Sequence, residues 1–333
     1  MRGSSVTDIA SDADVRLLEQ TLFEVKKVIV GQDRLIERLL TALLAGGHIL
    51  LEGVPGVAKT LAAETLATAV GGTFHRIQFT PDLVPSDIVG TRIYRAGKES
   101  FDVELGPIMA NLVLADEINR APAKVQSALL EVMAEGHVSL GGRTYRVPQP
   151  FLVLATQNPI ESEGVYQLPE AQRDRFLMRV VVGYPSEQDE LGILYRMSGP
   201  RPHASPVLDP QRLIGLQQRA QKVFVHHALA EYIVRLVTAT RDPALSGQLA
   251  YGASPRATLG LVAAARALAL LRGREYVLPA DVVDIAPDVL AHRLVLAFDA
   301  VADGVEPESI VHRILEAVTP PVIAPAQQEA VAA

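Results

Sequence analysis

The stretch His48-Ile49-Leu50-Leu51-Glu52-Gly53-Val54-Pro55-Gly56-Val57-Ala58-Lys59-Thr60 decides the fold, because it places a glycine loop between two elements. Its apolar residues 49–51 predict a short buried strand, and the pattern after Thr60 predicts a helix. The backbone N–H groups of such a loop and the positive end of the helix can hold nucleotide phosphates. Lys59 would reach β- and γ-phosphate oxygens, and the Thr60 hydroxyl would bind Mg²⁺. The candidate nucleotide-binding residues are Gly53, Val54, Pro55, Gly56, Val57, Ala58, Lys59, Thr60 and Leu61.

One position departs from the general form of this loop. That form has glycine at position 58, where this chain has alanine. Alanine has the smallest side chain that can replace glycine, and Gly53 and Gly56 keep the loop open, so the match is weakened but valid. The alternative is an ordinary strand-to-helix turn. The pair Lys59-Thr60 at the start of the predicted helix disfavours that alternative.

Two acidic residues follow the next strand of buried type. Residues 111–115 lead into Asp116 and Glu117, at the carboxyl edge where open α/β sheets bind ligands. We expect Asp116 to orient water on Mg²⁺ and Glu117 to polarise the water that attacks the γ-phosphate. Helix N-terminal charges are the alternative, and they explain one carboxylate better than the pair. A further strand, 151–155, leads to Asn158, which could contact the γ-phosphate or that water, although Asn-Pro alone is usually a turn.

The rest of the chain alternates short apolar runs with helical patterns. Strands are predicted at 49–51, 73–78, 112–115, 152–155 and 178–182, and helices at 14–30 and 32–45. This alternation predicts a parallel sheet covered on both faces. Segments 91–104 and 137–147 interrupt it and predict two β-hairpins, since glycines supply the positive φ of a tight turn. After residue 185 the strand patterns vanish, and the chain becomes rich in Ala and Leu.

These patterns divide the chain into four parts. We predict an α/β domain over 1–183, a linker over 184–205, an all-α domain over 206–318 and a flexible tail over 319–333. The most regular helix of the second domain covers 255–272.

Composition excludes several kinds of function. Cysteine is absent, which rules out disulfides and thiolate metal sites. A net charge of −7 and the absence of Trp disfavour a surface built to bind nucleic acid. Apolar runs such as 39–44 are too short to span a bilayer, and residues 1–14 lack the pattern of a secretory signal. We therefore expect a cytoplasmic protein.

Taken together, the motifs resemble those of the AAA+ ATPases and, within them, the MoxR family. The segments that carry the resemblance are 53–60, 79–83, 85–87, 114–122, 155–159, 168–176 and 252–257. They span most of residues 25–270, and Ala58 matches the form of the loop in this family.

The resemblance implies an AAA+ core with a five-stranded parallel sheet of order 5-1-4-3-2 and a C-terminal helical lid domain. It implies a homo-oligomeric ring, commonly a hexamer, with ATP bound between subunits and Mg²⁺ held by Thr60 and Asp116. Gly53, Lys59 and Thr60 match Walker A, whereas Asp116 and Glu117 match Walker B.

Further site residues follow from the resemblance alone. Asn158 matches sensor 1, and the segment Val30-Gly31-Gln32 matches the one that lines the adenine. Arg175 aligns best with the arginine finger supplied to a neighbouring subunit, and Arg173 competes for that role. For both arginines an ordinary salt bridge with Asp174 or Glu170 is the alternative.

The lid domain would add one catalytic residue. Arg256 matches sensor 2, which reaches the γ-phosphate from within the same chain. Alternatively, Arg256 is an ordinary solvated arginine at the start of a helix. In the family's strand order, Gln78 ends the strand beside that of Glu117 and could restrain it.

The resemblance also implies a task. MoxR-type proteins resemble chaperones that act with a partner bearing a von Willebrand factor A domain and remodel, assemble or activate clients, often by inserting metal cofactors. A nucleic-acid motor is the alternative from another class, since related rings carry similar hairpins and Arg143 and Arg146 could touch phosphates. A magnesium-chelatase-like motor subunit is a third.

Overall fold

The computed structural model describes residues 12–159 and 165–322 of the 333-residue chain. These residues form two compact units. One contains residues 21–39 and 46–214, and the other contains the described residues up to 20, residues 40–45 and the chain from 215 onwards. Helices α1 (Asp12–Val28) and α2 (Asp33–Ala45) contribute to both units.

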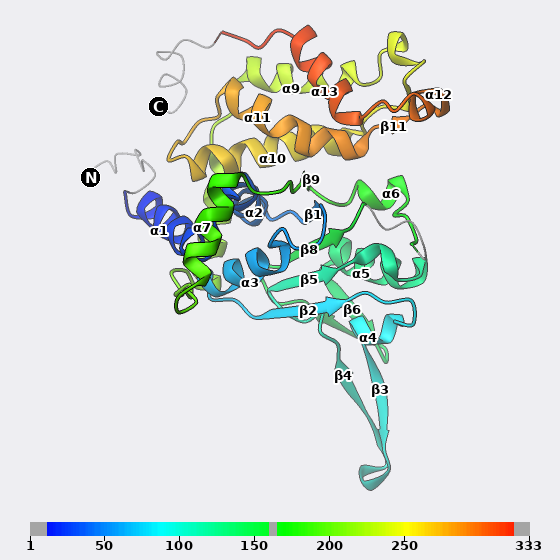
Figure 1. Ribbon diagram of the computed structural model, residues 1–333. Coiled ribbons are helices and arrows are strands. Elements are labelled where there is room, and N and C mark those ends of the chain that lie inside the picture. Colours follow the sequence, from blue (N-terminus) through cyan, green and yellow to red (C-terminus); the bar gives the residue numbers. More distant parts are fainter. Residues whose placement is uncertain (1–11, 160–164, 323–333) are drawn as a thin grey trace, which may run out of the picture. The chain divides into compact units, whose positions relative to one another are not determined.

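A five-stranded parallel sheet forms the centre of the first unit (Figure 1). Its strands are β1 (Ile49–Glu52), β2 (Phe74–Gln78), β5 (Leu112–Asp116), β8 (Leu152–Gln157) and β9 (Met178–Val181). They lie in the order β2-β5-β8-β1-β9. Numbered among themselves in chain order, this is the predicted order 5-1-4-3-2 read from its other edge. The central strands are apolar and buried, as both-face coverage requires.

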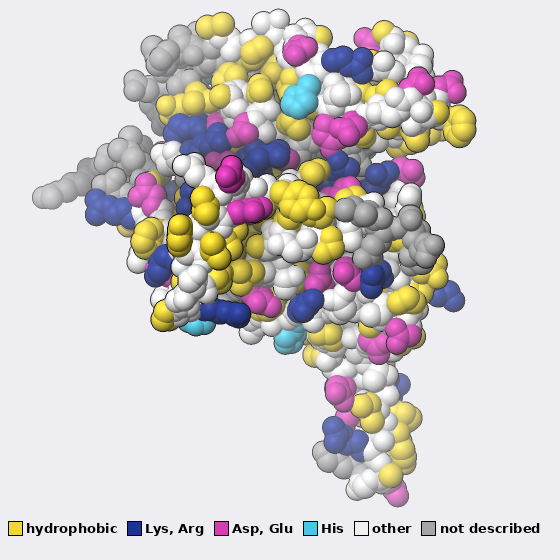
Figure 2. Space-filling view, viewed as in Figure 1, with side chains coloured by type: hydrophobic (Ala, Val, Ile, Leu, Met, Phe, Trp, Pro, Cys, Tyr) yellow, Lys and Arg dark blue, Asp and Glu magenta, His cyan; other side chains and the backbone are white. Residues whose placement is uncertain are grey.

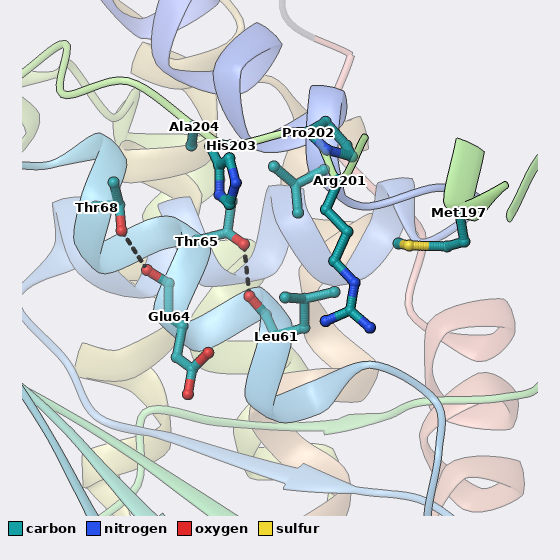
Figure 3. Close-up of a pocket in the computed structure, with 10 residues that line it drawn as sticks. Leu61, Glu64, Thr65, Thr68, Met197, Arg201, Pro202, His203 and Ala204 are labelled. Carbon is teal, nitrogen blue, oxygen red and sulfur yellow. Dashed lines mark hydrogen bonds between the residues drawn. The ribbon is translucent and has the colours of Figure 1, made fainter. Parts of the chain in front are cut away.

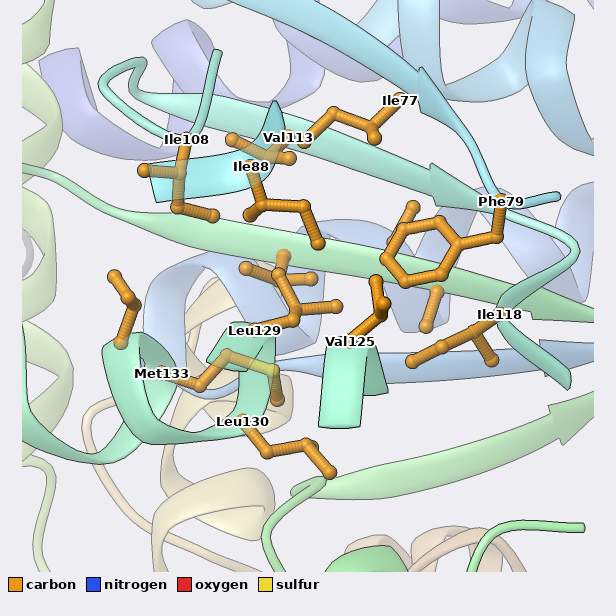
Figure 4. Packing of buried hydrophobic residues seen from close by; sticks show 14 of the residues in the cluster. Ile77, Phe79, Ile88, Ile108, Val113, Ile118, Val125, Leu129, Leu130 and Met133 are labelled. Atoms are coloured by element: carbon orange, nitrogen blue, oxygen red, sulfur yellow. The ribbon is translucent and has the colours of Figure 1, made fainter. Parts of the chain in front are cut away.

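Helices cover this sheet and complete its hydrophobic core. These helices are α3 (Lys59–Ala69), α4 (Pro85–Val89) and α5 (Ala123–Glu135), with the 3₁₀ turn η2 (Ile118–Arg120) after β5. The helices α6 (Glu170–Arg173) and α7 (Glu187–Met197) belong to the same unit but contain no buried residue. Figure 4 shows Ile88 of α4 and Leu129 of α5 packed with Val113 of β5. Burying each such side chain contributes roughly 1.5–3 kcal/mol. This core includes residues of β5 and β8, the two strands that end at Asp116 and Gln157.

Both predicted hairpins are present. Strands β3 (Gly90–Arg95) and β4 (Ser100–Leu105) pair antiparallel across η1 (Ala96–Lys98), and β6 (His137–Leu140) pairs with β7 (Arg143–Arg146). Gly141 and Gly142 turn the second hairpin with φ of 59° and 77°. The β3–β4 hairpin projects from its unit (Figure 1) and carries hydrophobic as well as charged side chains (Figure 2).

Helix α7 lies inside the segment 184–205, where the sequence predicts a linker. Its start is stabilised by a capping box, in which the Asp189 backbone N–H donates to Ser186 Oγ at 3.2 Å and the Ser186 N–H donates to Asp189 Oδ2 at 3.3 Å. This local signal makes part of the proline-rich connection helical.

The second unit is mainly helical. It contains most of α8 (Pro210–Lys222), followed by α9 (His227–Ala239), α10 (Pro255–Leu271), α11 (Pro279–Leu290), α12 (Phe298–Ala302) and α13 (Pro307–Ala317), with the 3₁₀ turns η3 (Pro243–Leu245) and η4 (Ala291–Arg293). The structure adds a short antiparallel pair, β10 (Leu249–Tyr251) with β11 (Val295–Leu296), which the sequence pattern did not indicate. Most of the predicted tail lies outside the described residues. Among the helices that are described, none is long and apolar enough to cross a membrane.

Candidate nucleotide-binding site

The glycine loop joins β1 to α3 as predicted, and its backbone takes unusual conformations. Gly56 has φ of 87°, which glycine adopts freely. Ala58 has φ of 63° and ψ of 20°, a left-handed conformation that explains why the general pattern has glycine there. Gly53 is required for another reason, since a Cβ atom on it would lie 2.5 Å from the Val182 carbonyl oxygen.

Lys59, at the first position of α3, faces backbone carbonyls at the foot of the loop. Its Nζ donates to the Gly53 carbonyl and, at 3.3 Å, to the Gln157 carbonyl. Burial lowers the pKa of the Lys59 ammonium, while the Asp116, Glu117 and Glu52 carboxylates act in the opposite direction. These carboxylates favour the charged form, which a phosphate-binding lysine needs.

Asp116 ends β5 with a side chain whose two oxygens have different partners. Oδ1 accepts a hydrogen bond from Thr156 Oγ1 at 2.6 Å. Oδ2 accepts from Arg76 Nε at 3.0 Å, from Arg76 Nη2 at 2.7 Å and from Thr60 Oγ1 at 3.5 Å. The Thr60 hydroxyl and the Asp116 carboxylate, which the sequence predicts as metal-binding groups, are thus adjacent.

Glu117 follows Asp116 but turns its side chain to other partners. Its φ of 57° is also left-handed, and its backbone N–H donates to Thr156 Oγ1 at 2.8 Å. Its Oε2 accepts from Gln78 Nε2 at 2.8 Å and forms an ion pair with Arg120 at 3.3 Å. The contact between Gln78 and Glu117 is the one that the sequence suggested.

A cavity of about 380 Å³ brings together Lys59, Thr60, Asp116, Glu117 and Asn158, whereas Arg175 of the same unit does not line it. Its lining residues are Pro55, Gly56, Ala58, Lys59, Thr60, Leu61, Arg76, Asp116, Glu117, Thr156, Gln157 and Asn158. Gly53, Val54 and Val57 do not line it, and the side chain of Val57 is buried. The loop presents its second half to this space.

Sequence reasoning missed Arg76 and Thr156. Thr156 holds both Asp116 and Glu117, and the only available signal was its place two residues before Asn158 in the same motif. Arg76 and Gln78 share one face of β2 because strand residues two apart point the same way. The register that pairs Gln78 with Asp116 arises from the folded sheet, so no local pattern marked Arg76 as part of the site.

A second cavity, of about 520 Å³, adjoins the first through Leu61, which lines both. Figure 3 shows that α3 supplies Leu61, Glu64, Thr65 and Thr68, opposite Met197 and the segment 201–204. Thr65 Oγ1 and Thr68 Oγ1 donate to the carbonyls of Leu61 and Glu64, which leaves a largely apolar wall. Glu64, Arg201 and His203 also line this space, so it could hold a group that is mainly apolar.

The segment Val30-Gly31-Gln32, expected near the adenine, contacts the start of α7. A Cβ atom on Gly31 would lie 2.2 Å from Asp189 Cγ, and Gln32 Nε2 donates to the Gly183 carbonyl at 3.1 Å. None of the three residues lines either cavity, whereas nearby Val28 lines the second. Their role in adenine binding stays a prediction.

The two arginine-finger candidates have different environments. Arg175 is exposed and donates from Nη1 to the Leu130 carbonyl at 2.6 Å. The side chain of Arg173 is 28% exposed, lies 3.8 Å from Glu170, and lines a third cavity of about 440 Å³ together with Asn158 and Arg179. Burial lowers the pKa of Arg173. Arg175 is therefore the more accessible to another subunit.

Arg256 lies in the other compact unit, at the start of α10. Its backbone N–H donates to Ser254 Oγ at 3.2 Å, so Ser254 caps the helix, and the Arg256 side chain is exposed. Its predicted contact with the γ-phosphate stays a prediction.

The strand order, the glycine loop and the cavity that joins Lys59 to Asp116 and Glu117 define a P-loop ATPase of the AAA+ class. The model of the ATPase family associated with various cellular activities (AAA) matches residues 48–178, and that of the AAA lid domain matches 243–314. The chain belongs to the MoxR family of AAA+ chaperone ATPases, and it binds and hydrolyses ATP.

Comparison with individual proteins supports this assignment. The chain is 63% identical over 315 residues to "Chaperone MoxR1" of Mycobacterium tuberculosis, which covers 93% of this chain and 84% of that protein. It is 35% identical over 299 residues to "Protein MoxR" of Methylorubrum extorquens, covering 82% and 86%. A crystal structure from Cytophaga hutchinsonii matches with a TM-score of 0.87 and 45% identity over 93% of this chain and 96% of that one.

Proposed function

We propose that this ATPase uses Mg²⁺-ATP, and that the 380 Å³ cavity holds its phosphates. The observation that carries the proposal is the convergence of Lys59, Thr60, Asp116, Glu117 and Asn158 on one space. Lys59 would bind β- and γ-phosphate oxygens, while Glu117 would orient and polarise the attacking water. Asn158 would hold the γ-phosphate or that water.

The residues present fit a magnesium ion. Mg²⁺ prefers oxygen ligands and keeps several waters, so it is usually bound by one or two protein groups together with substrate phosphates. Thr60 Oγ1 and Asp116 Oδ2 lie 3.5 Å apart at the edge of the cavity and offer a hydroxyl and a carboxylate. The ion would neutralise charge on the phosphate oxygens during transfer.

The second cavity is our candidate for the nucleotide base. It shares the lining residue Leu61 with the phosphate site, and its walls are mainly apolar, as base-binding pockets generally are. Leu61 and Met197 would then contact the base, together with the predicted segment Val30-Gly31-Gln32.

The task of the ATPase is proposed from its relatives. The name of the Mycobacterium tuberculosis protein is that of a chaperone, and we infer that this chain likewise remodels or activates client proteins. We propose a hexameric ring that acts with a von Willebrand factor A domain partner, including in the insertion of metal cofactors. The β3–β4 hairpin would contact the client, since its Tyr94 and Phe101 are 54% and 57% exposed.

Glu117→Gln tests the assignment of the catalytic base. Glutamine keeps the size of the side chain but cannot accept the proton of the attacking water, and general bases typically contribute about 10²- to 10⁴-fold. We expect ATP turnover to fall at least about 100-fold while ATP affinity, measured by calorimetry, changes little. Turnover close to that of the wild type would contradict the assignment.

The same variant tests the chaperone proposal. Because Glu117→Gln would hold ATP without hydrolysing it, its complexes with clients and partners should last longer. Copurification of a protein with a von Willebrand factor A domain, lost on addition of ADP, would support the proposed partner. Stimulation of wild-type turnover by DNA, with salt-dependent binding, would instead favour a nucleic-acid motor.

A further inference from the structure

One cationic side chain holds the carboxylate oxygen that a metal ion would need. Arg76 donates both Nε and Nη2 to the same oxygen of Asp116, Oδ2, at 3.0 and 2.7 Å. Charge-assisted bonds of this kind are roughly twice as strong as neutral ones. The Arg76 guanidinium thus occupies one side of the proposed metal site.

The partners of the two Asp116 oxygens indicate that Arg76 and a metal ion would compete for the same oxygen, Oδ2. Oδ1 accepts a hydrogen bond from the Thr156 hydroxyl at 2.6 Å. Oδ2 is the oxygen that faces the Thr60 hydroxyl. A cation held by Thr60 and Asp116, directly or through water, therefore needs the oxygen that Arg76 now holds.

The surroundings of Arg76 would allow its guanidinium to move away from Asp116. It lies on β2, an edge strand of the sheet, and its side chain is 48% exposed, against 11% for Asp116. Its other described contact is the bond from Nη2 to Gln78 Oε1 at 2.9 Å. An exposed guanidinium at a sheet edge can return to water, whereas the buried Asp116 carboxylate needs a cationic or hydrogen-bonding partner at all times.

We propose that Arg76 is a positioning residue that holds Asp116 before Mg²⁺ binds and releases Oδ2 when Mg²⁺ enters with the nucleotide. This inference rests on the Mg²⁺-ATP function proposed above. Two cations on one oxygen repel each other, so the ion pair has to break before the metal is bound. Breaking the Arg76–Asp116 pair then costs free energy, and metal binding is weaker by that amount.

Arg76→Gln tests this exchange. The dissociation constant of ADP is measured by calorimetry with excess Mg²⁺ and with EDTA, and ADP avoids hydrolysis during the measurement. Without the pair to break, the variant should bind ADP about twofold to fivefold more tightly than the wild type in Mg²⁺. Its affinity in EDTA should not increase.

Binding of the metal itself gives a second readout. Mn²⁺, titrated into the protein–ADP complex and followed by electron paramagnetic resonance, should half-saturate Arg76→Gln at a lower concentration than the wild type, by about the same factor. Arg76→Lys keeps the charge but loses the pair of hydrogen bonds to Oδ2. Its half-saturating Mn²⁺ concentration should therefore lie between those of the wild type and Arg76→Gln. Melting curves without nucleotide show whether each variant is folded.

Arg120→Gln is the matched control for charge. It also removes one positive charge beside an acidic side chain of the site, Glu117, but no described contact joins it to Asp116. If Arg76 acts through its contact, Arg120→Gln should shift the Mn²⁺ titration less than Arg76→Gln does. Equal shifts in the two variants would overturn the proposal in favour of a general effect of charge.

The remaining outcomes separate this inference from the metal proposal. ADP affinity of the wild type that is the same in Mg²⁺ and EDTA would overturn both. A wild type that responds to Mg²⁺, with no gain of metal affinity in Arg76→Gln, would overturn the exchange alone. Weaker ADP binding by Arg76→Gln in EDTA and in Mg²⁺ would identify Arg76 as a phosphate ligand and also overturn the exchange.

Discussion

Two residues of the site, Ala58 and Glu117, have left-handed backbones that L-amino acids with side chains seldom adopt. Each such residue carries strain of roughly 1–2 kcal/mol. Strain of this kind gathers at functional sites, where the surrounding structure holds it. At Ala58 the left-handed turn directs the loop into α3, and at Glu117 it separates the carboxylate from that of Asp116, although the two residues are adjacent in the chain.

Replacing Ala58 by glycine should remove this strain. We expect Ala58→Gly to raise the free energy of unfolding by up to about 1 kcal/mol, because relief in the folded state exceeds the added freedom of the unfolded chain. Thermal melting measures the change. The control is Ala63→Gly within α3, where the same replacement should destabilise by about 1 kcal/mol. A lower melting temperature for Ala58→Gly would contradict the inference that the backbone of Ala58 is strained.

At the scale of elements, His48 links three segments of the sheet and its cover. Its Nε2 lies 3.1 Å from the Met133 carbonyl at the end of α5, and its Nδ1 accepts from the Val153 N–H of β8 at 3.0 Å. The ring meets Phe151 edge-on at 5.5 Å. The neutral ring fits both bonds, since one nitrogen donates and the other accepts. Burial lowers the pKa of His48 to about 4.

This pKa predicts a loss of stability in mild acid. Unfolded His48 binds a proton near pH 6.5, but folded His48 does so only near pH 4. The unfolded state therefore gains protons first, and stability falls as pH decreases from about 6.5 to about 4, by on the order of 1–3 kcal/mol. Urea unfolding across this range measures it.

His48→Gln supplies the control, because an amide offers a donor and an acceptor without titrating. Carboxylates of the chain titrate in both proteins, so the informative quantity is the difference in unfolding free energy between wild type and variant. As pH falls, the unfolding free energy of the wild type should decrease relative to that of the variant. A constant difference from pH 7 to 4.5 would show that His48 does not titrate in this way.

At the scale of the whole molecule, the proposed ring would complete each site with a residue from its neighbour. Arg175 is exposed, and its bond to the Leu130 carbonyl is one that an anionic phosphate could replace. Arg173 is more buried and lies beside Glu170. These environments favour Arg175 as the residue given to another subunit.

Mixing two inactive variants tests this sharing. Arg175→Ala should lose about 10³-fold or more in turnover, and Arg173→Ala much less. In mixed rings of Arg175→Ala and Glu117→Gln, about a quarter of sites would combine an intact Glu117 with an intact Arg175 from the neighbour, so turnover should partly return. Pairing Arg175→Ala with a chain that carries both substitutions should restore nothing. Failure of the first mixture would show that Arg175 does not act between subunits.

The sequence by itself determined the features that depend on local chemistry. Short apolar runs predicted the five strands, glycine pairs predicted the turn of the β6–β7 hairpin, and the loop before Lys59 predicted the phosphate site. Each follows from the propensities of neighbouring residues, which are written along the chain. The strand order came with the family resemblance carried by these motifs.

Only the tertiary structure decided which distant side chains meet. The pairing of β2 with β5 brings Arg76 to Asp116 across 40 positions of the sequence, and β8 brings Thr156 to the same carboxylate. The capping box of Ser186 is a local pattern, but the prolines around it led to the prediction of a linker instead of a helix. Strand register depends on packing between segments far apart in the chain, so no local pattern carries it. For that reason the motifs indicated the phosphate loop, and only the folded sheet showed that Arg76 contacts Asp116.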